Sequence, residues 1–149
     1  MLTPRYIMIG GFLGAGKTTA MLKAAEYFAN KGLKVGLISN DQSQGLVDTN
    51  VLSSSGFATE EIAGGCFCCR FPSLVQASEK LQRQAQPDVY LAEPVGSCTD
   101  LVSTVVYPLE QMYGDRYSIA PLSVLVDPIR AQRFLGLLSG KTFSPKVNY

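Results

Sequence analysis

The fold is decided by one stretch of the sequence, Gly11-Phe12-Leu13-Gly14-Ala15-Gly16-Lys17-Thr18. It matches the phosphate-binding pattern G-x-x-x-x-G-K-[ST] in full. The apolar residues 6–10 before it predict a buried strand, and the apolar spacing over 16–29 predicts a helix that Gly32 ends. A strand, a glycine-rich turn and a helix in this order are the local structure that the pattern requires. The sequence therefore predicts a loop that binds the phosphates of a nucleotide.

The expected role of each loop residue follows from the chemistry of a nucleoside triphosphate. The helix N-terminus adds positive partial charge beside the phosphates. Lys17 would neutralise the β- and γ-phosphates, Thr18 would place its hydroxyl on Mg²⁺, and Thr19 would reach the α-phosphate. The other residues expected to bind the nucleotide do so through the backbone of the loop: Gly11, Gly14, Ala15 and Gly16.

Apolar strands alternate with helical segments along all 149 residues, about the length of one domain. Further strands are expected at 34–39, 59–62, 88–93 and 119–127. Further helices are expected at 46–54, 72–84, 99–112 with a break near Pro108, and 129–138. This alternation predicts an α/β fold, with a mostly parallel sheet and helices on both faces, in a single P-loop nucleotide-binding domain over residues 1–149.

Composition excludes several classes of protein. The 13 Lys and Arg against 12 Asp and Glu give a net charge of +1, which offers no electrostatic argument for nucleic acid or an anionic membrane as a partner. No apolar run reaches the ~18 residues that cross a bilayer. The sequence contains no His, so His-based triads, His general bases and His metal ligands are excluded. We expect a cytoplasmic protein with neither a nucleic-acid nor a membrane partner.

Carboxylates at the ends of predicted strands are candidates to complete the nucleotide site. Asp41 follows strand 34–39 and Glu93 ends strand 88–93, which is where P-loop folds place Mg²⁺ ligands and groups that position water. Each has an alternative role as a turn or helix-capping residue. We favour catalysis and Mg²⁺ binding for Asp41 and Glu93, and a cap for Asp127, which precedes a proline. Gly96 is expected to meet a γ-phosphate with its N–H.

Three thiols lie within four residues, at Cys66, Cys68 and Cys69. Thiolates select soft or borderline metals such as Zn²⁺, so the cluster predicts a metal site. A fourth ligand would come from water, Cys98, a carboxylate or a second chain. Two alternatives remain open, because C-x-x-C is also a redox spacing and buried Cys can serve only in packing. Cys98 by itself is interpreted as a packed thiol.

Three segments together resemble the CobW-like metallochaperone GTPases: Gly10–Thr19, Gly65–Cys69 and Glu93–Gly96. The segment Asn40-Asp41 also resembles the related urease and hydrogenase nickel-insertion GTPases. The resemblance implies a SIMIBI-type G domain that binds GTP (or ATP) and Mg²⁺ at Lys17 and Thr18. It also implies Zn²⁺, Co²⁺ or Ni²⁺ at the three clustered cysteines, delivery of that metal to a client metalloprotein, and a homodimer.

The sequence departs from this family in three respects: it has no Asn-Lys-x-Asp motif to read guanine, no second domain and no His-rich metal-storage stretch. We expect that motif and the last strand to lie beyond residue 149, in a chain truncated at its C-terminal end. Two other functions remain as alternatives. One is an ATP-dependent small-molecule kinase or ligase with structural cysteines, and the other is an activator module that binds nucleotide without hydrolysing it.

Overall fold

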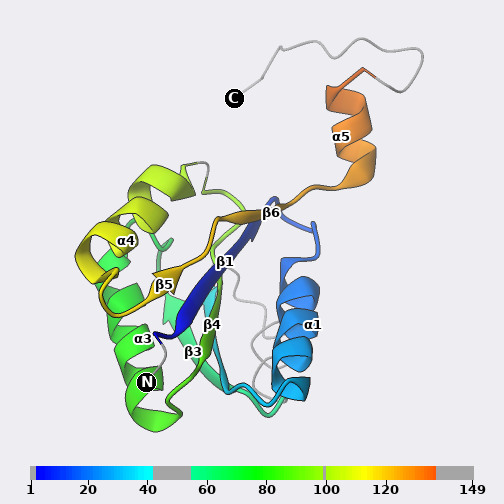
Figure 1. Ribbon diagram of the computed structural model, residues 1–149. Coiled ribbons are helices and arrows are strands. Elements are labelled where there is room, and N and C mark those ends of the chain that lie inside the picture. Colours follow the sequence, from blue (N-terminus) through cyan, green and yellow to red (C-terminus); the bar gives the residue numbers. More distant parts are fainter. Residues whose placement is uncertain (1–2, 42–54, 99, 137–149) are drawn as a thin grey trace.

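The computed structural model describes residues 3–41, 55–98 and 100–136. The elements in chain order are β1 (Arg5–Gly11), α1 (Lys17–Asn30), β2 (Val35–Asp41), β3 (Ala58–Ala63), α3 (Phe71–Gln84), β4 (Val89–Glu93), the π-helical segment η1 (Val102–Val106), α4 (Tyr107–Tyr113), β5 (Ser118–Ile119), β6 (Ser123–Leu125) and α5 (Pro128–Phe134) (Figure 1). The expected strands at 34–39, 59–62 and 88–93 and the helix at 72–84 are confirmed within a few residues. The helix expected at 46–54 lies outside the described residues.

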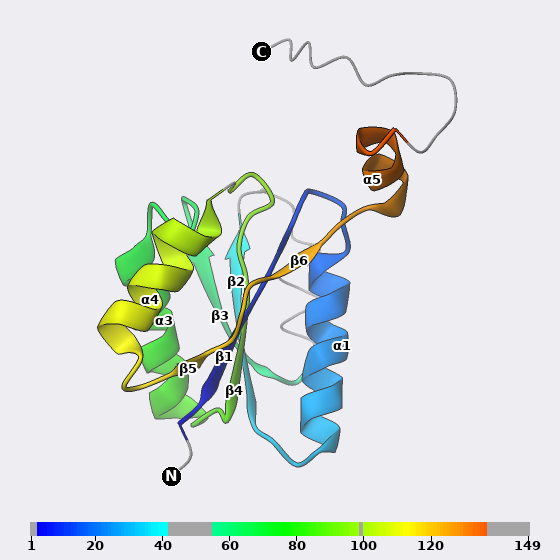
Figure 2. The same ribbon diagram turned by 45° about the horizontal axis from the view of Figure 1, so that its top comes forward.

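The strands form one sheet in the order β3-β2-β4-β1-β5, and β6 also pairs with β1. All pairings among the described strands are parallel. This confirms the expected α/β architecture with a mostly parallel sheet. Because parallel strands share a direction, the carboxyl ends of β1, β2 and β4 lie at one end of the sheet (Figure 2).

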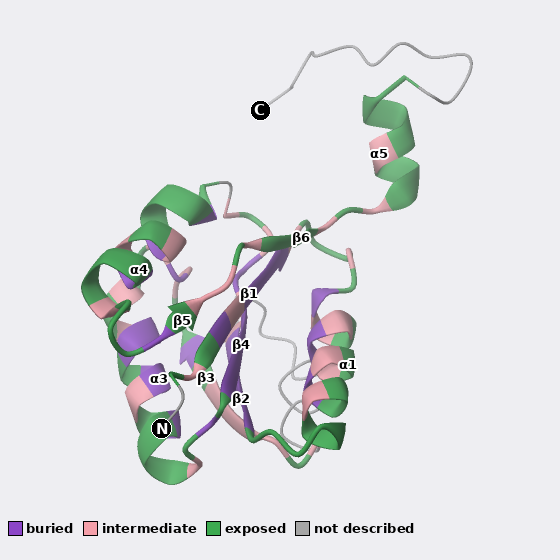
Figure 3. Cartoon of the chain, in the orientation of Figure 1, coloured by how far each residue is buried: buried purple, intermediate pink, exposed green. Residues whose placement is uncertain are grey.

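The sheet separates two apolar cores, and helices cover both of its faces (Figure 3). Alternate side chains of a strand point to opposite faces. In β1, Tyr6 and Met8 therefore pack on the face covered by α3 and α4, while Ile9 packs on the face covered by α1. Three of the helices contribute fully buried side chains to these cores: Leu74 and Leu81 from α3, Leu109 from α4, and Met21 and Ala25 from α1.

The expected single strand at 119–127 is wrong, because the structure has two short strands there. Tyr6 pairs with Ile119 in β5, whereas Ile9 pairs with Ser123 in β6. Three steps along β1 thus correspond to four steps along the neighbouring chain, so one extra residue bulges out around Pro121. A proline has no N–H to donate to the ladder, which makes a bulge at the sheet edge the physical result.

The expected break of the helix near Pro108 is also wrong. The backbone N–H of Tyr107 donates to the carbonyl of Val102, five residues back, so η1 is one wide turn that continues directly into α4. A π turn accommodates a proline that an α-helical ladder would reject. Val105 and Leu109 on either side are fully buried, and their burial holds the helix against the sheet.

The helix expected at 129–138 is observed as α5, Pro128–Phe134, and residues 137–138 lie outside the described part. Asp127 is its N-cap, as expected: the carboxylate accepts hydrogen bonds from the N–H of Ile129 at 2.8 Å and of Arg130 at 3.1 Å. Among the described residues, no helix is both long and apolar enough to span a membrane.

Candidate functional site

The loop between β1 and α1 has the backbone conformation that its glycines make possible. Gly14 and Gly16 have φ values of 77° and 88°, in the left-handed region that side chains disfavour. The N–H of Ala15 donates to the carbonyl of Phe12 at 3.1 Å, which closes the turn, and α1 starts at Lys17. The N-terminus of a fourteen-residue helix therefore opens beside the loop.

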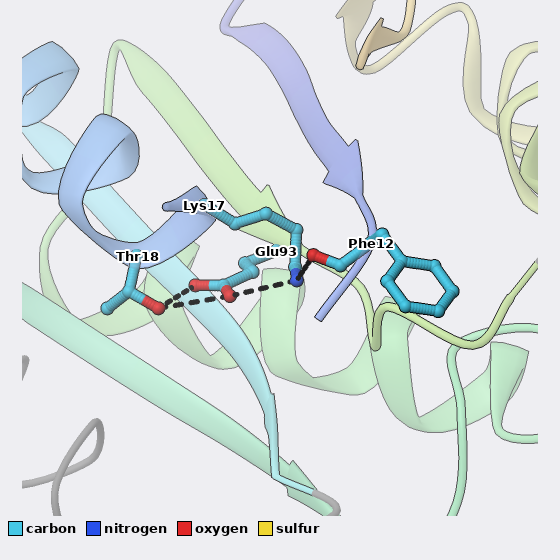
Figure 4. Close-up of polar contacts among 4 residues, drawn as sticks. All are labelled: Phe12, Lys17, Thr18 and Glu93. Carbon is cyan, nitrogen blue, oxygen red and sulfur yellow. Dashed lines mark hydrogen bonds and ion pairs between the residues drawn. The ribbon is translucent and has the colours of Figure 1, made fainter. Parts of the chain in front are cut away.

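Lys17, Thr18 and Glu93 form one group of polar contacts inside this loop (Figure 4). The hydroxyl of Thr18 donates to both carboxylate oxygens of Glu93, at 3.0 Å and 2.9 Å. The buried ammonium of Lys17 lies 4.0 Å from Oε1 of Glu93 and donates to the carbonyl of Phe12 at 3.3 Å. The structure thus joins two residues at the start of α1 to the carboxyl end of β4.

The loop after β4 lies directly against the phosphate-binding loop. A Cβ at Gly96 would come within 2.7 Å of the backbone nitrogen of Leu13, 3.0 Å of the carbonyl carbon of Phe12 and 3.1 Å of the carbonyl oxygen of Gly11. These are backbone atoms, which cannot rotate out of the way. Only glycine fits at this position without a shift of one of the two loops.

A cavity of about 510 Å³ opens between the two loops. Most residues predicted from sequence to bind nucleotide line it: Gly14, Gly16, Lys17, Thr18, Thr19, Glu93 and Gly96. Two predicted residues contribute differently. Ala15 uses its N–H inside the turn, and Gly11 lies against β6, where an added Cβ would come 2.6 Å from the carbonyl oxygen of Leu125. Asp41 ends β2, and its side chain lies outside the described part.

Asn40 connects this cavity to the segment that carries the cysteines. It lines the cavity, and its side-chain amide donates to the carbonyl of Ile62 at 2.8 Å and to that of Gly65 at 2.6 Å. Its Oδ1 atom is buried and has no hydrogen-bond partner among the residues that the structure describes. Sequence reasoning singled out the Asn40-Asp41 pair but assigned a role only to Asp41. The contacts of Asn40 join residues up to 25 positions apart, which no local pattern reveals.

The thiols of Cys66, Cys68 and Cys69 converge just beyond Gly65. Their sulfur atoms all lie within 4.8 Å of one another, and all are free thiols. The Sγ atoms of Cys66 and Cys68 are 2.7 Å apart, and the N–H of Cys69 donates to Sγ of Cys66 at 3.4 Å. Three soft donors at this spacing form the greater part of the shell that a tetrahedral Zn²⁺ requires.

The contacts within the cluster give its thiols different pKa values. Burial raises the pKa of Cys66, but hydrogen bonds from the Cys68 and Cys69 thiols and from the Cys69 N–H outweigh it and lower that pKa to about 6. The same contacts favour the protonated form of the partners: hydrogen bonds with Cys66 and Cys68 raise the pKa of Cys69 to about 11. A thiolate is the form that ligates metal, so Cys66 is prepared as a ligand at neutral pH.

The sequence model of the CobW/HypB/UreG nucleotide-binding domain matches residues 5–143. The chain belongs to this family. Among curated proteins, it is similar to the zinc chaperone YeiR of Escherichia coli, at 35% identity over 106 residues, and to the zinc-regulated GTPase metalloprotein activator 1 of Dictyostelium discoideum, at 33% identity over 104 residues. These alignments cover 67% and 60% of this chain.

The CobW/HypB/UreG domain is only part of those relatives, since the chain spans 32% of the zinc chaperone and 21% of the activator. A solved structure with the same fold is the signal recognition particle receptor FtsY of Elizabethkingia anophelis. Its TM-score is 0.67 at 24% identity, covering 91% of this chain and 46% of the receptor. That likeness shows a shared fold, an α/β domain with a mostly parallel sheet.

Proposed function

We propose that this CobW/HypB/UreG domain is a GTPase that couples nucleotide hydrolysis to binding and delivery of a transition metal. The observation that carries the proposal is the position of Asn40, which lines the phosphate cavity and bonds to the residue directly before the cysteine cluster. A structural change in the phosphate cavity can thus reach the cysteine cluster through Asn40. The names of the relatives, a zinc chaperone and a zinc-regulated GTPase metalloprotein activator, support the same function.

On this proposal, each residue of the cavity has its own role in nucleotide hydrolysis. Lys17 neutralises the β- and γ-phosphates, and the backbone of the phosphate-binding loop binds the rest of the polyphosphate together with Thr19. Glu93 and Asp41 act in the switch regions, where they orient the attacking water and help to hold Mg²⁺. Gly96 presents its N–H to the γ-phosphate and so senses whether the nucleotide is a triphosphate.

The donor set of the cavity fits Mg²⁺. The Thr18 hydroxyl and the Glu93 carboxylate are hard oxygen donors in direct contact, at 2.9 Å, and Mg²⁺ prefers oxygen ligands. Bound there, the ion supplies neutralisation of charge on the phosphate oxygens. Thr18 and Glu93 are the side chains that would hold the ion.

The cargo on this proposal is Zn²⁺, with Co²⁺ or Ni²⁺ as the other candidates, held by Cys66, Cys68 and Cys69 and passed to a client metalloprotein. Three cysteines clustered within four residues, rather than spread along the chain, favour a reducing compartment, so we propose the cytoplasm. We also propose that the chain forms a homodimer and that GTP rather than ATP is the substrate.

The test is a titration of the reduced chain with Co²⁺ and Zn²⁺, with and without GTP and Mg²⁺. Sulfur-to-Co²⁺ charge-transfer absorption reports the thiolate ligands, and phosphate release reports turnover. Stoichiometric thiolate binding that shifts with nucleotide, with metal-dependent turnover, is the expected result. Turnover that responds to a small-molecule acceptor and not to metal would instead indicate a kinase or ligase. Nucleotide binding without turnover under every condition would indicate an activator module.

A further inference from the structure

The three clustered thiols leave a tetrahedral metal one ligand short. Structural and storage sites for Zn²⁺ hold four ligands, and a Zn–S bond of ~2.3 Å places two thiolates of a regular tetrahedron about 3.8 Å apart. The segment 66–69 itself contains no further thiol, because its remaining residue is Phe67. Any fourth protein ligand must come from another part of the chain.

Cys98 meets that requirement by position. It follows β4 in the loop that begins with Glu93, thirty residues from the cluster, yet its Sγ atom lies 3.8 Å from that of Cys68. This separation equals the edge of the four-thiolate tetrahedron, whereas the 2.7 Å between Cys66 and Cys68 would have to open by about 1 Å. Cys98 and Cys68 are both partly buried and pack against the same core, whereas Cys69 is exposed.

The loop that carries Cys98 is the same loop that contacts the phosphate-binding turn. Its N–H donates to the carbonyl of Val95 at 3.3 Å, and Val95 is buried, so residues 95–98 form one closed turn. Gly96, at the centre of this turn, rests on the backbone of Leu13 and Phe12. A displacement of Gly96 would therefore carry Cys98 with it.

We propose that Cys98 is the fourth thiolate ligand of the metal site, and that the turn 95–98 makes its contribution depend on the nucleotide. The inference rests on the proposed function and deepens it, since it assigns the residue through which the γ-phosphate acts on the metal. Each thiol that binds the metal releases its proton to solvent, so the full site holds four thiolates on one divalent ion. When the turn moves with the γ-phosphate, the site alternates between four and three thiolates, and the metal is held tightly or loosely.

The experiment compares Co²⁺ binding by the reduced wild-type chain with that by Cys98→Ser and Cys98→Ala. Cys66→Ser is the matched reference, because it removes one of the three clustered thiols of the proposed metal site. Binding of a fluorescent GDP analogue checks the fold of each variant. We expect both Cys98 variants to lose about one quarter of the charge-transfer absorption of the saturated complex. We expect the Kd for Co²⁺ to rise at least about 10-fold. Addition of Mg²⁺ and a non-hydrolysable GTP analogue should change the wild-type spectrum and leave that of Cys98→Ala unchanged.

A measurement on the wild-type chain avoids any effect of substitution on folding. Iodoacetamide labelling followed by mass spectrometry should show that saturating Zn²⁺ protects Cys98 as fully as it protects Cys66. A Co²⁺ spectrum that is the same in Cys98→Ser as in the wild type, or a Cys98 that stays reactive under saturating Zn²⁺, would overturn this inference and leave the proposed function intact. Absence of any thiolate band in the wild type would overturn both.

Discussion

Replacement of Gly96 by alanine tests the contact between the two loops most directly. The added methyl would lie 2.7 Å from the nitrogen of Leu13 and 3.0 Å from the carbonyl carbon of Phe12, against a normal separation of ~3.5 Å or more. One loop must therefore move by several tenths of an ångström. Overpacking of this kind costs about 1–3 kcal/mol. With a slope of about 2 kcal/mol per molar urea, the midpoint of denaturation should fall by about 0.5–1.5 M.

The same substitution should separate triphosphate from diphosphate binding. If the turn 95–98 relaxes away from the phosphate-binding loop, only a ligand with a γ-phosphate has to draw it back. Affinity for a GTP analogue should then fall by about 5–100-fold while GDP affinity changes little. The control is Gly10→Ala, whose Cβ would meet a flexible side-chain atom, Cδ1 of Leu101, at 3.3 Å. Equal stability and equal nucleotide affinities in the two variants would refute the reasoning.

Three further predictions concern single side chains. Asn40→Ala should lower the free energy of unfolding in urea by about 1–3 kcal/mol, because the carbonyls of Ile62 and Gly65 lose their donor. Asn30→Ala, at the exposed end of α1, should lower it far less. Similar losses in the two variants would contradict a stabilising role for the Asn40 hydrogen bonds. Thr18→Ala should reduce Mg²⁺-dependent phosphate release by about 100-fold, and unchanged turnover would remove Thr18 from the Mg²⁺ site. Alkylation of Cys66 should be half-maximal near pH 6, where Cys69 is still protonated because its pKa is about 11; a common midpoint for both thiols would argue against the cluster geometry.

Most of the fold could be predicted from the sequence because its strands and helices follow simple periodicities. The two errors both involve proline. At Pro121 and Pro108 the sequence shows only that a backbone donor is missing, and the response depends on the surroundings. At the sheet edge the chain bulged, whereas on the covered face the buried Val105 and Leu109 held the helix together through a π turn. Such tertiary effects do not appear in a local pattern.

In the candidate site, the residues of motifs with fixed spacing could be predicted from the sequence, whereas the contacts between distant segments of the chain could not. Gly16, Lys17 and Thr18 are adjacent in sequence, so their convergence on one cavity follows from the loop itself. The contact between Cys98 and Cys68 depends on how the loop after β4 packs beside the loop after β3. The sequence therefore favoured a packed thiol for Cys98, and the 3.8 Å separation from Cys68 became visible only in three dimensions.

The bulge at Pro121 also determines which changes of length this edge of the sheet accepts. Gly11 is paired with Leu125, whose carbonyl oxygen occupies the space that a Cβ of Gly11 would need. The strand β6 therefore supports the start of the phosphate-binding loop in one register. A bulge takes up a residue that has no partner on the neighbouring strand, so one residue inserted beside Pro121 would enlarge the bulge and leave Gly11 paired with Leu125. One residue inserted within β6 itself would instead shift its register and turn its side chains to the opposite face. In homologous chains, changes of length should accordingly occur between β5 and β6 and not within β6.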